Sequence, residues 1–184
     1  MELKGKKVLL VGLAKTGIST IKCLAKYGAD ITVNDIKTED QLEEIIAEIK
    51  DIDGIKYILG HHPEDIADID MVVVSPGVPL DLPFIKKVIE ENKELIGEVE
   101  LAYELANKPY FVGITGTNGK TTTTSLTGEI FEKAGKETYV VGNIGNPVID
   151  AVQAANEGAS FVTELSSFQL ESIKDFKPNW RSHE

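Results

Sequence analysis

The sequence predicts an α/β fold made of two consecutive parallel-sheet domains, residues 1–97 and residues 98–184. Short continuous apolar runs, such as residues 7–12, are typical of strands buried on both faces of a parallel sheet. These runs alternate with amphipathic helical segments. Two of the runs, before residues 12–17 and 113–121, lead into glycine-rich turns that open a helix. Together these observations favour a Rossmann-like first domain and a second domain of the P-loop type.

The composition of the 184-residue chain is that of a globular protein, since 42% of its residues are hydrophobic. Its net charge of −11 argues against general binding to nucleic acid or anionic membranes, so an anionic ligand requires a local site. Cys23 stands alone, which excludes an internal disulfide and a cysteine zinc site; we expect a small buried residue on a helix. The sequence has no signal-peptide pattern and no long apolar span, so the expected location is the cytoplasm.

Strands and helices alternate through the first domain. Residues 7–12 form the first strand, and apolar residues at helical spacing (Ile18, Ile21, Leu24) predict an amphipathic helix after it. Residues 31–35 form a second strand, which completes a β-α-β unit. The patterns that follow predict a helix at 39–50, strands at 55–59 and 70–75, a helix at 81–91, a strand at 95–97 and a helix at 98–106.

The turn at residues 12–17 resembles a dinucleotide fingerprint, because an acid, Asp35, follows it by about 20 residues. That fingerprint reads Gly-x-Gly-x-x-Gly, whereas Ala14 replaces the middle glycine and carries a methyl group where a pyrophosphate would approach. A site for NAD is one interpretation, and a Rossmann-like half that holds another nucleotide is favoured over it. Asp35 is interpreted either as a hydrogen-bond acceptor for a sugar or base, or as a strand-end turn residue.

Two other loops of the first domain contain polar candidates. A Ser-Pro-Gly turn at residues 75–77 follows a strand, at the edge where open α/β sheets bind ligands; a purely structural turn is the alternative. His61 and His62 follow another strand. Adjacent histidines on a regular strand point to opposite faces and cannot both bind one metal, so we interpret them as loop residues.

The second domain opens with a candidate phosphate loop between an apolar run at 110–114 and a helical segment at 122–134. The loop has three glycines, at Gly113, Gly116 and Gly119. They allow backbone N–H groups to face an anion, and the helix N-terminus adds its positive dipole end. Lys120 would reach the β- and γ-phosphates, and the Thr121 hydroxyl would bind Mg²⁺. The spacing departs from the general P-loop pattern, which has glycine where Ile114 stands, and a plain glycine turn with an exposed lysine is the alternative.

The rest of the second domain continues the α/β alternation. The patterns predict a strand at 137–141, a loop at 142–147, a helix at 148–155, a strand at 161–165 and a short helix at 166–171. Glu164 lies near the C-terminal end of the last of these strands. P-loop enzymes hold Mg²⁺ with a second carboxylate near the end of a neighbouring strand, so Glu164 is a candidate metal ligand. The alternative is a strand-end glutamate without a function.

Taken together, these motifs resemble the Mur ligases, the ATP-dependent amide ligases of peptidoglycan synthesis. Gly-Thr-Asn-Gly-Lys-Thr-Thr at residues 116–122 is similar to the ATP loop of that family and of folylpolyglutamate synthase. The members that add D-glutamate are most similar in four further segments, residues 12–17, 75–77, 142–145 and 164–171. The last of these is the most specific, and the resemblance covers residues 3–179.

The resemblance implies a reaction, two cofactors and a set of site residues. The reaction is the ATP- and Mg²⁺-dependent addition of D-glutamate to UDP-N-acetylmuramoyl-L-alanine through an acyl phosphate, by a monomeric protein. The implied ATP contacts are Gly116, Thr117, Asn118, Gly119, Lys120, Thr121 and Thr122. The implied contacts of the UDP precursor are Lys15, Thr16, Asp35, Lys37, Ser75, Pro76, Gly77, Asn143 and Ser166. Lys120 and Glu164 would act in catalysis, and Thr121 and Glu164 would bind Mg²⁺.

The last residues depart from the family pattern. Family members continue with a buried strand, a metal-contacting His, a carbamylated Lys and a domain that carries D-glutamate, whereas residues 180–184 are polar. We therefore expect no core strand in this tail and an incomplete central ATP-binding domain that cannot complete the ligation alone. His183 lies outside the family's His motif and is given no role. Open strand edges favour association, so we expect aggregation.

There are three other interpretations of the sequence. In the first, which stays open for the isolated chain, the first domain is a UDP-sugar- or nucleotide-binding module without catalysis and the rest is partly ordered. A nicotinamide-dependent oxidoreductase leaves the phosphate loop unexplained, and a P-loop kinase leaves the first domain unexplained.

Overall fold

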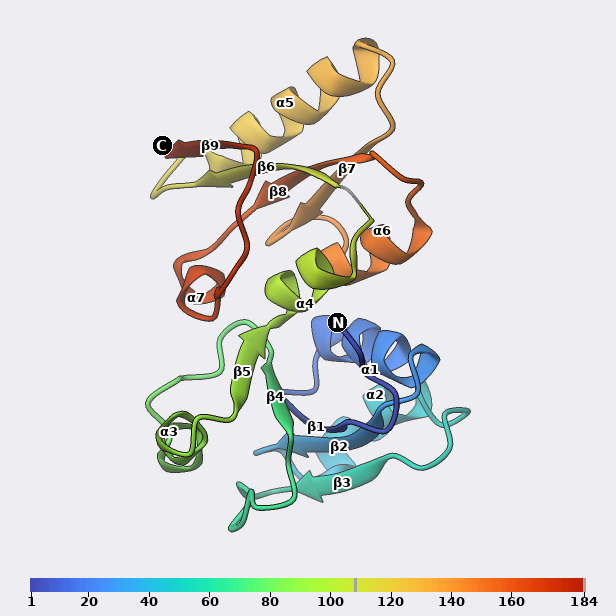
Figure 1. Cartoon of the computed structure of the whole chain (residues 1–184), viewed down its shortest axis with the longest axis vertical. Coiled ribbons are helices and arrows are strands. Elements are labelled where there is room, and N and C mark those ends of the chain that lie inside the picture. Colours follow the sequence, from blue (N-terminus) through green and yellow to red (C-terminus); the bar gives the residue numbers. More distant parts are fainter. Residues whose placement is uncertain (108, 184) are drawn as a thin grey trace. The chain divides into compact units, whose positions relative to one another are not determined.

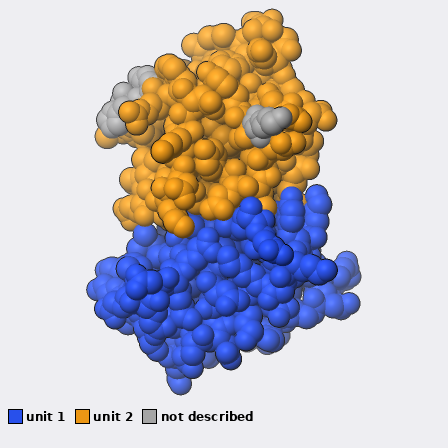
Figure 2. Space-filling model, in the orientation of Figure 1, with its two compact units in different colours: residues 1–98 blue, residues 99–184 orange. Residues whose placement is uncertain are grey.

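The computed structural model describes residues 1–107 and 109–183, and the chain divides into two compact units, residues 1–98 and residues 99–184 (Figure 2). Each unit contains a parallel β-sheet with helices packed against it (Figure 1). The predicted α/β fold class is confirmed. Among the described residues, no helix is both long and apolar enough to cross a membrane.

In the first unit, five parallel strands form a sheet in the order β3-β2-β1-β4-β5. They are β1 (Lys7–Val11), β2 (Asp30–Asp35), β3 (Lys56–Leu59), β4 (Met71–Val74) and β5 (Glu94–Gly97). The helices are α1 (Lys15–Lys26), α2 (Glu39–Ala47) and α3 (Pro83–Glu90). The direction in which strands are added reverses between β1 and β4. The C-terminal ends of these two strands are therefore the topological switch point, where open α/β sheets bind ligands.

Side chains that alternate along β1 supply the core on both faces of this sheet. Leu9 and Val11 belong to a buried cluster with residues of β4 and with Phe84 of α3. Successive strand residues point to opposite faces, so Val8 and Leu10 face the other side, where α1 packs on β1 and β2. Because both faces are covered, the strand reads as a continuous apolar run.

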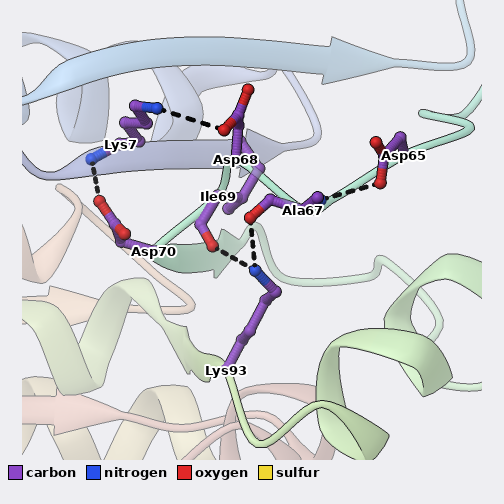
Figure 3. Close-up of polar contacts among 7 residues, drawn as sticks. All are labelled: Lys7, Asp65, Ala67, Asp68, Ile69, Asp70 and Lys93. Atoms are coloured by element: carbon purple, nitrogen blue, oxygen red, sulfur yellow. Dashed lines mark hydrogen bonds and ion pairs between the residues drawn. The ribbon is translucent and has the colours of Figure 1, made fainter.

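Polar contacts stabilise the end of this sheet at which β1 and β4 begin (Figure 3). The backbone N–H of Lys7 donates to Asp70 Oδ2 at 2.8 Å. Lys93 Nζ donates to the carbonyl oxygens of Ala67 and Ile69, at 3.0 and 2.8 Å. These bonds fasten the loop that carries the chain from β3 across the sheet to β4.

In the second unit, four parallel strands form a sheet in the order β7-β8-β6-β9. They are β6 (Tyr110–Thr115), β7 (Thr138–Gly142), β8 (Ser160–Glu164) and β9 (Trp180–His183). The helices are α4 (Glu98–Leu105), which leads into the unit, α5 (Lys120–Lys133), α6 (Val148–Ala154) and α7 (Ser167–Glu171). Figure 1 shows α5 on one face of this sheet and α6 on the other.

From the sequence we expect no core strand in the polar tail; the structure has a strand there, β9, at the end of the strand order. The strand pairs in parallel with β6, and Trp180 lies beside Val112. Asn179 fixes the register, because its N–H donates to the Phe111 carbonyl at 2.8 Å and its Oδ1 accepts from the Phe111 N–H at 2.8 Å. Trp180, the first residue of β9, is 49% exposed. Backbone groups form the ladder, so this pairing does not require apolar side chains.

A buried carboxylate joins the start and the end of the second unit. Glu100 of α4 accepts hydrogen bonds from three consecutive backbone N–H groups, those of Lys174, Asp175 and Phe176, at 2.8, 3.0 and 3.0 Å. These bonds satisfy a charge that would otherwise be costly to bury, and they fix the segment between α7 and β9.

Candidate functional site

The first candidate site lies at the switch point of the first unit. Val11 and Val74, the last residues of β1 and β4, are paired in the sheet. The turns that follow these strands are joined by a hydrogen bond of 2.7 Å from Ser75 Oγ to the Gly12 carbonyl. The sheet topology thus brings together the glycine turn and the Ser-Pro-Gly turn, two segments that are far apart in the sequence.

Asp35 connects the end of β2 to the same glycine turn. Its Oδ2 accepts the backbone N–H of Leu13 at 2.7 Å, and its Oδ1 accepts the backbone N–H of Lys37 at 2.9 Å. Asp35 therefore orders both neighbouring loops, which agrees with its interpretation as a strand-end turn residue. A carboxylate has about four lone-pair sites, so two of them remain for a ligand.

A pocket of about 250 Å³ opens at this point. Its lining includes Gly12, Asp35, Ile36, His62, Gly77 and Val78. Two further predicted contacts, Lys15 and Thr16, lie in the first turn of α1, and the side chain of Lys37 is exposed. The pocket combines apolar walls with a few polar groups, which is the usual character of a small-molecule site.

A close approach between α1 and β1 requires glycine at position 17. A Cβ atom on Gly17 would lie 2.6 Å from the Gly12 carbonyl oxygen, which is a backbone atom and cannot move aside easily. Ala14, by contrast, is the exposed N-cap residue of α1. The substitution of the middle glycine therefore leaves the packing of the turn intact and puts the methyl group on its outer side.

The phosphate loop of the second unit connects β6 to α5. Gly119 is the N-cap residue, so α5 begins at Lys120, two residues before the predicted start. Lys120 Nζ donates to the Gly116 carbonyl at 2.8 Å, within the loop. Thr124 Oγ1 donates to the Lys120 carbonyl at 2.7 Å, so the hydroxyl of this buried threonine has a partner within the helix. The other predicted ATP contacts in the loop and first turn are Thr117, Asn118, Thr121 and Thr122.

Glu164, at the end of β8, meets this loop. The residue is 1% exposed. Thr121 Oγ1 donates to Oε2 at 2.9 Å, and Asn143 Nδ2 donates to Oε1 at 3.0 Å. A hydroxyl and a carboxylate are the oxygen ligands that Mg²⁺ prefers, and both hydrogen-bond partners of the buried charge are neutral. These residues fit a divalent cation next to the phosphate loop.

Ser166 has a structural role in the described contacts. Its Oγ accepts the Gln169 N–H at 3.3 Å, and Gln169 Oε1 accepts the Ser166 N–H at 2.9 Å. This capping box lies at the start of α7, directly after Glu164 and Leu165. It holds the chain in a fixed path as it leaves the candidate metal ligand.

Another group of carboxylates in the second unit lies apart from the phosphate loop. Oxygen atoms of Glu100, Glu104 and Asp175 lie within 4.8 Å of one another. Both oxygens of Glu100 accept backbone N–H groups, so we interpret this group as part of the clamp on the segment before β9.

Family models match most of the chain. The model described as "Mur ligase MurD-like, N-terminal domain" matches residues 6–97, and the model described as "Mur ligase middle domain" matches residues 114–179. This chain belongs to the Mur ligase family. The resemblance inferred from the motifs is confirmed.

Curated relatives of this Mur ligase chain include proteins named UDP-N-acetylmuramoylalanine--D-glutamate ligase. The one from Clostridioides difficile (strain 630) is 71% identical over 178 residues, which make up 97% of this chain and 40% of the relative. The one from Alkaliphilus metalliredigens (strain QYMF) is 56% identical over 181 residues, covering 97% of this chain and 39% of the relative. The chain thus spans about 40% of the length of these relatives.

His62 lines the first pocket of this Mur ligase chain, although the sequence does not predict it as a site residue. The sequence predicts His62 only as a loop residue, and it does lie in the loop after β3, but it also lines the pocket. The signal that could have found it is Asn34, a polar residue next to Asp35 at the end of strand β2. A buried amide needs partners, and His62 is one of them.

Proposed function

We propose that this chain contributes the UDP-precursor site and the phosphate loop of an ATP-dependent ligase that joins D-glutamate to UDP-N-acetylmuramoyl-L-alanine. The observation that carries the proposal is the convergence of Thr121 and Asn143 on the buried Glu164, at the first turn of the helix that Lys120 opens. The names of the curated relatives support the choice of substrates.

In this proposal, the second unit positions the phosphates of ATP. Backbone N–H groups at residues 116–122 and the N-terminus of α5 bind the phosphate oxygens. Lys120 neutralises charge on the phosphoryl group as it transfers. Thr121 and Glu164 would hold Mg²⁺, which would screen the phosphate charges. Asn143 keeps the Glu164 carboxylate oriented toward Thr121.

The first unit binds the nucleotide end of the acceptor, at the turn of residues 12–17, Asp35 and the turn of residues 75–77. The γ-phosphoryl group of ATP passes to the alanyl carboxylate, which forms an acyl phosphate and releases ADP. The amine of D-glutamate then attacks the acyl carbon, an amide bond forms and phosphate leaves.

A calorimetric titration of the 184-residue chain tests the acceptor site. We expect UDP-N-acetylmuramoyl-L-alanine to bind and NAD not to bind under the same conditions. Binding of NAD without binding of the UDP precursor would contradict the proposal, because it would assign the first unit to a nicotinamide nucleotide.

The substitution Lys120→Ala tests the phosphate loop. We expect the variant to lose measurable binding of Mg²⁺-ATP and to keep its affinity for the UDP precursor. Lys133→Ala is the matched control, because Lys133 lies in the last turn of the same helix and pairs with Glu129. ATP binding by the Lys120 variant at the strength of the unsubstituted chain would show that the loop does not hold phosphate.

A further inference from the structure

His62 lies at the junction of a buried amide and the pocket of the first unit. Asn34 of β2 is fully buried, and its Nδ2 donates to the carbonyl oxygens of Ile58 and His61, at 2.8 and 2.7 Å. The remaining polar atom of the amide, Oδ1, is 3.3 Å from His62 Nδ1. His62 is half-buried and is among the lining residues of the pocket at the ends of β1 and β4.

These contacts determine which nitrogen of the imidazole carries hydrogen. Two carbonyl oxygens face Asn34 Nδ2, so the amide cannot be turned over without losing both bonds. Asn34 Oδ1 can only accept, and Nδ1 of His62 must therefore be the donor. In the neutral ring, Nε2 then has a free lone pair and acts as an acceptor. In the part of the chain that the structure describes, Nε2 makes no hydrogen bond.

The ring is also held by an aromatic neighbour. The centroids of His62 and Phe84 are 4.9 Å apart, and Phe84 belongs to the buried core cluster. A bond at Nδ1 and a ring contact together fix the plane of the imidazole before any ligand binds, which lowers the entropic cost of using it. The pocket lining also includes the Asp35 carboxylate and the Asn34 amide, whose Oδ1 already faces His62 Nδ1. The acceptors of His62 and Asp35 favour a ligand that offers N–H or O–H donors.

We propose that His62 is a specificity-determining residue that accepts, at Nε2, a hydrogen bond from the nucleoside part of the ligand. This inference rests on the proposed function, in which the first unit binds a uridine nucleotide. Uridine offers two kinds of donor, the imide N3–H of the base and the ribose hydroxyls. Cytidine has no hydrogen at N3, so an acceptor aimed at that position selects uridine.

Two substitutions separate the ligand contact from the contact with Asn34. His62→Asn places an amide donor near the Nδ1 position and removes the acceptor at Nε2. His62→Gln places an amide oxygen near the Nε2 position and removes the donor to Asn34. Loss of one neutral hydrogen bond weakens binding roughly two- to tenfold. We expect this loss of affinity for UDP-N-acetylmuramoyl-L-alanine in His62→Asn, with substantial recovery in His62→Gln. Thermal melting of each variant reports on the fold.

Modified nucleotides identify the donor. N3-methyl-UDP and 2′-deoxy-UDP are compared with UDP as competitors of the UDP precursor, in the unsubstituted chain and in His62→Asn. If His62 accepts from N3–H, the methyl group weakens competition in the unsubstituted chain and does so much less in the variant. If it accepts from the ribose 2′-hydroxyl, the 2′-deoxy analogue shows this coupling instead. If His62 has a merely structural role, the His62→Asn substitution weakens competition by all three nucleotides equally.

The outcomes distinguish this inference from the function on which it rests. Two results would overturn the role of His62 and leave the acceptor site in place. One is an equal affinity for the precursor in His62→Asn and in the unsubstituted chain. The other is an equal loss of affinity for all three nucleotides in His62→Asn. Failure of the unsubstituted chain to bind the precursor would overturn the acceptor site, and the role of His62 with it.

Discussion

Glu164 is a carboxylate in the core of the second unit whose two hydrogen-bond partners, Thr121 and Asn143, are both neutral. A buried charge whose described partners are neutral is costly unless their hydrogen bonds compensate it. A bound cation would supply the opposite charge, so the proposed metal site predicts that Glu164 costs stability in the unliganded chain.

The substitution Glu164→Gln tests this trade-off. Glutamine can keep a bond to Asn143 through its oxygen and donate to the Thr121 hydroxyl, while the charge is removed. We expect the unliganded variant to be more stable by about 1 kcal/mol, or roughly 2–4 °C in Tm. We also expect Mg²⁺-ATP to raise its Tm less than it raises that of the unsubstituted chain. A lower Tm without ligand would show that the charge is well compensated.

Gly142 is required where β7 passes the end of β8. It has a φ of +104°, and a Cβ atom there would collide with the Glu164 carbonyl oxygen. We expect Gly142→Ala to lower the free energy of unfolding by about 2–4 kcal/mol, from backbone strain together with overpacking. Gly158→Ala is the control, since Gly158 has a φ of +81° and open space at its Cβ position, and about 1 kcal/mol is expected. Urea unfolding measures both, and equal losses would contradict the steric argument.

At the scale of elements, the strands and helices up to residue 171 follow from hydrophobic periodicity and glycine positions. Apolar runs predict β1, β4 and β6 because both faces of these strands are covered. Strand β9 could not be predicted, because its pairing depends on backbone groups and on Asn179, and the side chains of Trp180 and Arg181 are exposed. Periodicity detects burial of side chains, and an edge strand has little of it.

Strand β9 depends on Asn179, which leads to a prediction. Asn179→Ala leaves the N–H of the buried Phe111 without its side-chain acceptor, which costs about 1–3 kcal/mol. We expect faster hydrogen exchange at the Phe111 amide and across β9, measured by mass spectrometry or NMR. The exposed Asn107 provides a control substitution. Unchanged exchange at Phe111 would mean that the backbone ladder alone holds the strand.

At the scale of the whole molecule, each unit has a carboxylate whose pKa is lowered by local hydrogen bonds. The side-chain and backbone N–H groups of Asn156, with the Tyr139 hydroxyl, hold the pKa of Glu137 below its ordinary value of 4.5. The Ala67 N–H holds the pKa of Asp65 below its ordinary value of 3.8. A lowered pKa in the folded state stabilises the fold above the ordinary value, and this stabilisation is lost as the pH falls through the folded-state pKa.

Acidification should therefore destabilise both units. We expect Tm to fall as the pH is lowered below about 4.5, the ordinary pKa of a glutamate. In a variant with Asp65→Asn and Glu137→Gln, the amides keep acceptors for the same donors and do not titrate, so the fall should be smaller. Tm measured from pH 7 to pH 3 compares the two chains, and identical curves would show that other groups control the acid transition.

The two candidate sites differ in how far the sequence predicts them. The glycine turns, Asp35 and Glu164 are predictable, because each is a chemically distinctive residue at the end of a recognisable strand. The position of His62 is not, because it depends on a bond to Asn34 from another strand and on a ring contact with Phe84 from a helix. Local patterns cannot specify such contacts, since they arise only when the sheet has formed.

The clamp at Glu100 also has a consequence for the order in which the chain is made. Its partners lie 74 to 76 positions later in the sequence, and β6 acquires its neighbours β8 and β9 only after most of the second unit has left the ribosome. The five strands of the first unit all precede β6, so that unit can close its sheet while the second is still being synthesised. During synthesis, the apolar strand β6 therefore remains without β8 and β9 until those later strands have been made.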